Sequence, residues 1–317
     1  MTEGALSDRL DQTIDTILAR GDATAALADA ELAPLARLAA DLRHYPSPEF
    51  TARLRTHLEG RTTMSATLAS TNIREGFTTI TPYVRVKEAG LAGFLARVFG
   101  AEETHSTRGS GGGMHREVRV GNSMIMIGES GAEDVMPIRP AAFHVFVDDV
   151  DAAFARAIAE GATALGAPAD RHYGERAGFV RDTFGNHWYI ATHLGGSSVP
   201  AGLRSVTPFL HVPGAAAYIE FLKRAFGAVE KSRVDAEGGI RYAQMRIGNA
   251  ALELGDAEGR PISGSFYLYV DDVDALYERA VAAGATSLWT PADQPYGDRV
   301  GAVEDSMRNQ WFIARTL

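Results

Sequence analysis

Three side chains in the middle of the sequence, His115, Glu117 and His144, could do acid–base chemistry. They lie in the runs HREVRV and FHVFV, where apolar and polar residues alternate as in a β-strand that buries one face. Because successive side chains of a strand point to opposite faces, the valines take one face and these three residues the other. A histidine oriented by a carboxylate is typical of general acid–base catalysis, so they are the candidate catalytic residues.

The same alternation indicates which other side chains face the candidate catalytic residues. Val84 and Trp188 belong to the apolar faces of their strands, which leaves Tyr83 and Tyr189 on the other face. We therefore expect one concave surface where polar groups converge in a mostly apolar hollow, the usual form of a ligand site. The alternative is that the two histidines are hydrogen-bonded interior groups. The candidate ligand-binding residues are Tyr83, Met126, Phe146, Tyr173, Arg176, Tyr189, Tyr242, Glu253 and Tyr267.

Two of these candidates, Tyr173 and Arg176, lie on a predicted loop that leads into a late strand. Loops at the mouth of a scaffold often carry function. An arginine there could hold a carboxylate or a phosphate with two parallel hydrogen bonds. The alternative is an arginine that pairs with a neighbouring acid and fixes the loop.

Composition limits the classes of function. The chain has 317 residues, 45% hydrophobic and 22% charged, which predicts a packed fold of two or three domains. A net charge of -9 argues against nucleic acid as the main partner. The absence of cysteine excludes disulfides and thiolate zinc sites and fits a cytoplasmic protein. The sequence lacks a signal peptide and an apolar run of about 18 residues, so we expect no membrane partner.

The region after residue 77 repeats itself, and the register holds over four segments. Each copy contains the order strand, helix and three strands twice, which predicts four βαβββ units in an α+β fold. In the runs Asp148-Asp149-Val150-Asp151 and Asp271-Asp272-Val273-Asp274, aspartate caps a helix more simply than it binds a cation. The matching segments are 80–103 with 206–230, 115–130 with 242–257, 143–163 with 266–286, and 172–192 with 295–315.

We predict four segments along the chain. Residues 1–60 carry leucine and isoleucine at helical spacing and form a short helical segment that could dock on the rest, self-associate or bind another protein. Residues 61–77, rich in Thr, Ser and Ala, form a linker. The two copies, 78–195 and 204–317, form two modules.

These motifs resemble the vicinal-oxygen-chelate superfamily of glyoxalases, bleomycin-resistance proteins and dioxygenases, in particular its PhnB-like branch. The resemblance is carried by TPYVRV, VFGAEE, HREVRVGNSMIMIGES and VFVDDVDA, and most specifically by YGERAGFVRDTFGNHWYIATH (173–193). It implies that paired units roll a sheet into a cup, with helices outside and a ligand or a divalent metal inside. The second copy departs from the pattern at Ser306-Met307-Arg308, where the family usually has Pro-Phe-Gly.

The resemblance also implies where metal ligands would stand. The superfamily pattern implies four ligand positions in each copy, and among these eight residues only Glu253 is a plausible ligand. A catalytic divalent-metal site usually needs about three protein ligands. We therefore expect no cofactor; an unusual divalent-metal site built from the candidate catalytic residues is the alternative. The implied positions are Thr81, Met126, Ala142 and Tyr189 in the first copy, and Thr207, Glu253, Ser265 and Phe312 in the second.

The first module is the predicted site, because the second has Tyr242, Gln244 and Tyr267 in place of the candidate catalytic residues. The favoured hypothesis is a protein that binds a small organic molecule there without metal. One alternative is a lyase, isomerase or dioxygenase that acts on a small oxygenated substrate, with a histidine as general acid or base. Another is a ligand sensor that contacts a partner through the N-terminal helices.

Overall fold

The computed structural model describes residues 73–317, apart from 110–111, 131–136, 258 and 260. The described residues all belong to one compact unit. The predicted helical segment and most of the predicted linker lie outside the described residues, so those two predictions stay open.

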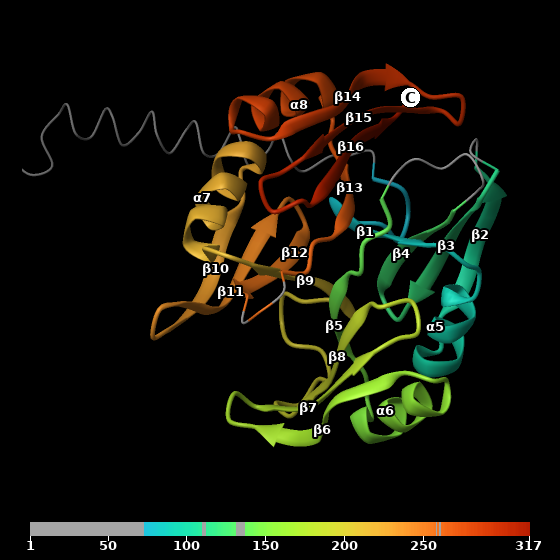
Figure 1. Ribbon diagram of the computed structural model, residues 1–317, viewed down its shortest axis with the longest axis vertical. Helices are drawn as coiled ribbons and strands as arrows, with labels where there is room; N and C mark the ends of the chain where they lie inside the picture. The colour runs from blue at the N-terminus through green and yellow to red at the C-terminus, as the bar shows by residue number, and fades with distance from the viewer. Residues whose placement is uncertain (1–72, 110–111, 131–136, 258, 260) are drawn as a thin grey trace, which may run out of the picture. The chain divides into compact units, whose positions relative to one another are not determined.

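The four predicted βαβββ units are all present in the α+β fold (Figure 1). The first copy contains β1 (Ile80–Val86), α5 (Leu91–Phe99), β2 (Glu102–Arg108), β3 (Met114–Val120), β4 (Ser123–Glu129), β5 (Ala142–Phe146), α6 (Val150–Ala159), β6 (Thr163–Arg171), β7 (Glu175–Arg181) and β8 (His187–His193). The second contains β9 (Val206–Val212), α7 (Ala215–Phe226), β10 (Val229–Ala236), β11 (Gly239–Ile247), β12 (Ala250–Asp256), β13 (Ser265–Tyr269), α8 (Val273–Ala282), β14 (Thr286–Asp293), β15 (Asp298–Glu304) and β16 (Gln310–Thr316).

The two copies exchange halves when they build their sheets. One eight-stranded sheet has the order β14-β15-β16-β13-β1-β4-β3-β2, and the other has the order β10-β11-β12-β9-β5-β8-β7-β6. The joints are antiparallel pairs, β1 with β13 and β5 with β9, and Figure 1 shows the early strand of each pair beside the late one. Each sheet therefore takes half of its strands from each copy, rather than all from one copy as expected.

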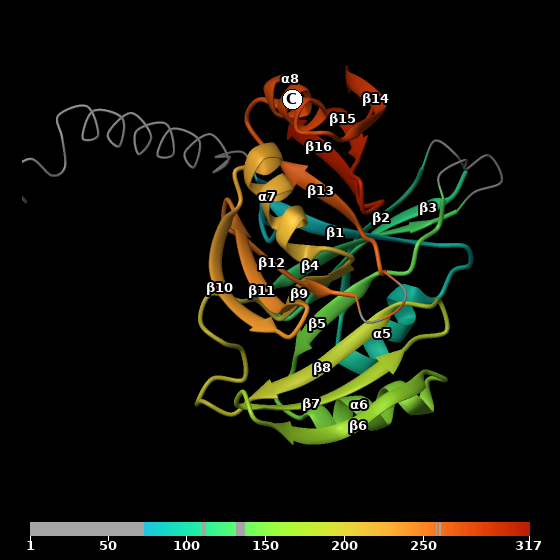
Figure 2. The ribbon, with the colours of Figure 1, turned by 60° about the vertical axis from the view of Figure 1, so that its left-hand side comes forward.

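The helices keep the two halves of each copy together. In the first copy, Leu91 and Leu95 of α5 share one buried cluster with Ala153 of α6, Phe143 and Trp188. An equivalent cluster in the second copy surrounds α7 and α8. Figure 2 shows α5 near α6 and α7 near α8. Each copy thus has its own helix-facing core, and each sheet's opposite face is shared between copies.

Local sequence signals explain where the helices begin and end. Asp149 and Asp272 accept hydrogen bonds from the backbone N–H groups of Ala152 (2.9 Å) and Ala275 (3.0 Å), which is the predicted helix capping. The helices α5 and α7 end at glycines in the left-handed conformation, because glycine lacks the Cβ that makes it costly. Among the described residues, no helix is long and apolar enough to span a membrane.

Candidate functional site

The exchange of halves separates the candidate catalytic residues. His115 and Glu117 lie on β3 in the first sheet, whereas His144 lies on β5 in the second. The prediction of one concave surface was wrong on this point, because β1 pairs with β13 rather than joining the sheet of β5. We call the inner face of β1–β4 and β13–β16 the first cup, and that of β5–β8 and β9–β12 the second cup.

The first cup contains a cavity of about 740 Å³. The strand alternation places its polar side chains correctly, because the valines of β1 and β3 are buried against the helices. Side chains from both copies line it, among them Tyr83, His115, Glu117, Met126, Tyr267 and Tyr269. Four of the sequence candidates from the first copy and one from the second therefore meet here.

A buried carboxylate forms the polar centre of the first cup. Arg74 donates two hydrogen bonds to Glu117, of 2.6 and 2.7 Å, and His115 Nε2 lies 3.5 Å from the same carboxylate. Burial alone would raise the pKa of Glu117, but the hydrogen bonds from His115 and Arg74 outweigh it and lower the pKa to about 2. Glu117 is therefore ionised at neutral pH, with its charge balanced by the guanidinium.

Aromatic rings form the walls around this centre. Tyr83 contacts Tyr267 and Phe312 edge to face, with ring centroids 5.7 and 5.5 Å apart. Tyr267 stacks on Phe312 at 5.3 Å, and Trp289 lies 5.6 Å from Phe312. The flat faces and edges of these rings suit a planar organic guest.

The second cup is organised around a histidine between two carboxylates. His144 Nδ1 lies 3.2 Å from Glu253, and its Nε2 lies 3.4 Å from Glu175. Burial lowers the pKa of His144, but the two carboxylates raise it more, to about 9, so the ring is charged at neutral pH. The Tyr242 hydroxyl donates to the other oxygen of Glu253 at 2.7 Å, which places both candidates beside His144.

Other candidates lie in the second cup as well. Phe146 lies against His144, with ring centroids 4.2 Å apart. The Tyr189 hydroxyl lies 2.7 Å from His211 Nε2. Burial and the nearby His187 lower the pKa of His211 to about 4, so the neutral ring can accept the tyrosine proton. Tyr189 is therefore hydrogen-bonded inside the second cup.

The loop candidate Arg176 does not bring its guanidinium into either cup. Arg176 donates to Asp151 of α6 (2.6 and 2.8 Å) and to Asp170 (3.0 Å) on the outer, helix-covered face. It cannot clamp a ligand in the cup, because strand alternation sends Glu175 inward and the next residue outward. Tyr173 is 56% exposed on the turn before β7.

The implied metal positions supply one carboxylate in the second cup and none in the first. In the first cup the implied positions are Thr81, Met126, Ser265 and Phe312, whose only oxygens are hydroxyls. In the second, both oxygens of Glu253 are already bound, and its neighbours at these positions are Thr207, Ala142 and Tyr189. No group of three or more His, Asp or Glu that could hold a metal occurs among the described residues.

Sequence reasoning missed two contributors to the sites. Arg74 stands in the predicted Thr- and Ser-rich linker, where no periodic pattern marks it as a partner of Glu117. Glu175 was assigned to a loop, although it begins β7 and faces His144. The alternation of β7 (Glu175, Ala177, Phe179) was the signal that could have found it, because Phe179 contacts Tyr189 in the same cup.

Comparison with known families agrees with this geometry. The family model described as the Glyoxalase/Bleomycin resistance protein/Dioxygenase superfamily matches residues 90–190 and 204–313. The chain belongs to this superfamily and carries two tandem copies of its domain, as the sequence motifs predicted. The PhnB-like branch stays a prediction.

Relatives and solved structures extend the comparison. An uncharacterized protein of Mycobacterium bovis is 34% identical over 127 residues, which cover 36% of this chain and 84% of the relative. A protein of the same organism, provisionally named glyoxylase CFP32, is 24% identical and covers 67% of this chain and 84% of the relative. A glyoxalase I variant from Zea mays shares the fold, with a TM-score of 0.62 at 14% identity, over 81% of this chain and 96% of that one.

Proposed function

We propose that the protein binds a small, flat organic molecule in the first cup without a metal ion. The observation that carries the proposal is the cavity of about 740 Å³, lined by tyrosines of both copies and by one polar centre. Ligand sites of this size usually combine apolar walls with a few placed polar groups. The metal positions of this cup supply no carboxylate or imidazole, which favours a guest held by the rings.

The polar centre would orient the guest. Glu117 accepts from Arg74 through both oxygens, so it holds the guanidinium in place rather than standing alone. His115 is about one quarter exposed, and its Nδ1 makes no hydrogen bond within the described part of the chain. This ring nitrogen is the group that would meet a polar atom of the guest. A guest with an aromatic body and one hydrogen-bonding edge fits this arrangement.

The catalytic alternative draws less support from the geometry. His115 and His144 lie in different cups, so they cannot act on the same substrate as an acid and a base. The nitrogens of His144 already face Glu253 and Glu175. A lyase or isomerase in the first cup would rest on His115 alone.

A screen of aromatic fragments tests the proposal. A native-state ligand raises the melting temperature, and Trp289 beside the cavity should report the same ligand through its fluorescence. We expect His115→Gln to weaken a hit about tenfold, and His172→Gln, at an exposed loop position, to leave it unchanged. Trp289→Phe should remove the fluorescence change and keep the thermal shift. Ligands whose affinity is unchanged by His115→Gln, or whose binding requires added divalent metal, would contradict the proposal.

A further inference from the structure

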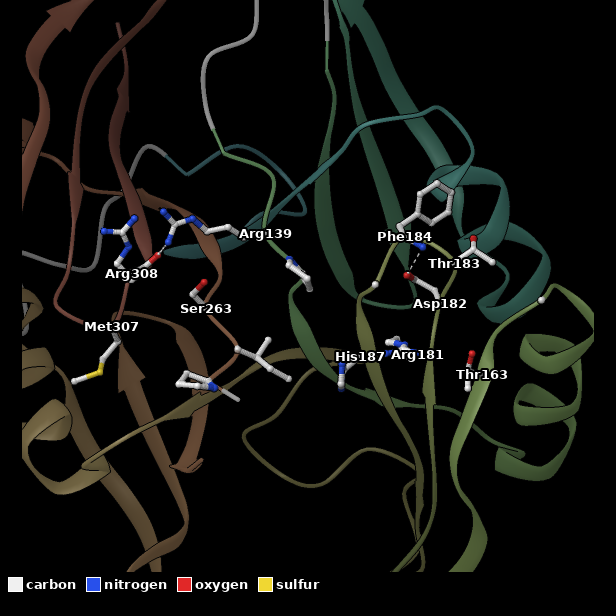
Figure 3. Close-up of a pocket in the computed structure, with 15 residues that line it drawn as sticks. Arg139, Thr163, Arg181, Asp182, Thr183, Phe184, His187, Ser263, Met307 and Arg308 are labelled. Atoms are coloured by element: carbon white, nitrogen blue, oxygen red, sulfur yellow. Dashed lines mark hydrogen bonds between the residues drawn. The ribbon is translucent and has the colours of Figure 1, made fainter. Parts of the chain in front are cut away.

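A second and larger cleft, of about 880 Å³, lies outside both cups, where turns of the two copies face each other. Its walls come from equivalent segments: 139–140 and 181–187 of the first copy, and 261–263 and 307–308 of the second. Figure 3 shows Arg139 near Arg308 on one wall, and Arg181 with His187 on the other. We call it the inter-repeat cleft.

Positive charge in the inter-repeat cleft exceeds negative charge. Arg139 donates to Glu304 (2.8 Å) and to the backbone oxygen of Arg308 (2.6 Å), and Arg308 Nε lies 3.1 Å from the other oxygen of Glu304. One carboxylate thus serves two guanidinium groups. Arg181, across the cleft, has no acidic partner in the part of the chain that the structure describes.

The remaining acid at the cleft is turned away from it. Asp182 is 4% exposed, and its oxygens accept hydrogen bonds from the Phe184 and Asn186 backbones, the Asn186 side chain and the Trp188 indole. It is committed to the turn before β8. The cleft therefore presents guanidinium groups without a carboxylate that would repel an anion, apart from the shared Glu304.

The backbone of Arg308 is an independent sign of a role for this cleft. Its φ of 68° is the only positive φ of a non-glycine among the described residues. The equivalent residue in the first copy is Gly185, with a φ of 93°. A side chain in the left-handed region is costly, and such strain gathers at functional sites. Glycine would adopt this turn conformation at a lower energetic cost than arginine. The arginine therefore occupies a backbone conformation that its residue type disfavours.

The three arginines of the cleft stand at positions at which the two copies differ. Arg308 stands opposite Gly185, Arg139 corresponds to Ile262, and Arg181 corresponds to Glu304. The turns themselves are the same, since an aspartate binds a tryptophan indole at 2.9 Å in each. The two equivalent turns thus share one scaffold but differ in charge at the cleft.

We propose that the inter-repeat cleft is a second ligand site, for an organic anion with a phosphate or carboxylate group. Arg181, which has no acidic partner among the described residues, would hold the anionic group in charge-assisted hydrogen bonds, and Arg308 on the opposite wall would add to the positive potential that attracts it. Phe184, Ile262 and Met307 would contact the apolar body of the ligand. The volume suits a small molecule.

Calorimetric titration of the full chain with 1-naphthyl phosphate and with 1-naphthoate tests the site, with neutral 1-naphthol as the reference. We expect saturable binding of one anion per chain and little binding of naphthol. A preference between the two anions identifies the head group. Arg181→Gln should weaken binding tenfold or more, and Arg308→Gly should weaken it by a smaller factor that still exceeds twofold. Arg224→Gln, which removes the same charge from the exposed side of α7, should change it less than twofold.

Folding and binding can be separated in this test. Arg308→Gly should melt no lower than the natural chain, because glycine relieves the left-handed backbone. Absence of saturable binding would overturn the proposal. So would an equal loss in Arg224→Gln, which indicates net charge alone. Binding lost in His115→Gln but kept in the cleft variants would place the anion in the first cup and also overturn it.

Discussion

Replacing His144 by glutamine should remove a specific pH dependence of stability. The folded-state pKa of His144 is raised from 6.5 to about 9 by Glu253 and Glu175, and Tyr242 also bonds Glu253. A raised pKa adds stability that is fully present below pH 6.5 and is lost as the pH rises through about 9. At about 1.4 kcal/mol per pKa unit, the loss amounts to about 3 kcal/mol.

Urea unfolding at intervals from pH 6 to pH 10 measures this effect. The natural chain should lose stability steadily above pH 6.5, and His144→Gln should be less stable at pH 6 and nearly flat over the same range. The variant leaves two buried carboxylates without their cation, which should cost about 3–5 kcal/mol. His172→Gln, which changes an exposed histidine, should keep the natural slope. Parallel pH curves for the natural chain and His144→Gln would refute the raised pKa of His144.

Three further predictions concern the first cup and the outer face. Glu117→Gln should lower the free energy of unfolding at pH 7 by about 2 kcal/mol, because it removes the charged partner of Arg74. In the natural chain, the stability that this pair contributes should be lost as the pH drops from 4.5 towards 2. Urea unfolding at a series of pH values measures both effects. Gly128→Ala should lower the affinity of the first cup for its ligand, because the new Cβ collides with the tip of Tyr83 and displaces its side chain. The loss of stability should stay below about 1 kcal/mol, because that side chain can move. Ligand titration and thermal melting separate the two effects. Arg176→Ala should leave both the stability and the ligand affinity nearly unchanged, because its ion pairs are exposed to solvent; a tenfold loss of affinity would restore the clamp hypothesis.

The features that could be predicted from the sequence are those that depend on a few neighbouring residues. Val118 and Val120 bury one face of β3, and this alone sends Glu117 to the other face. Asp149 and Asp272 cap their helices because the N–H groups that they satisfy lie three residues away. Strand alternation and helix capping together predict the four βαβββ units and the residues on each face of their strands.

The partners of β1 and β5 could not be predicted in the same way. The two copies have nearly the same pattern of apolar and polar residues, so the sequence of β1 is compatible with pairing to β5 as well as to β13. Only packing over the whole chain decides between these pairings, and it brings Thr81 beside Tyr267, 186 residues later in the chain's numbering. The ion pair of Arg74 with Glu117 could not be predicted for a related reason, because its two residues are distant in sequence and share no periodic pattern.

The exchange of halves changes what divergence between the copies means. Glu253 and Tyr242 of the second copy complete the surroundings of His144 in the second cup, and Tyr267 of the second copy completes the walls of the first. Substitutions in the second copy are therefore divided between two cups, and neither cup is the property of one copy. The second copy contributes to both cups, because each sheet takes half of its strands from it. The first cup contains a cavity, whereas the second is organised around a charged histidine between two carboxylates, so the same chain combines two differently built centres.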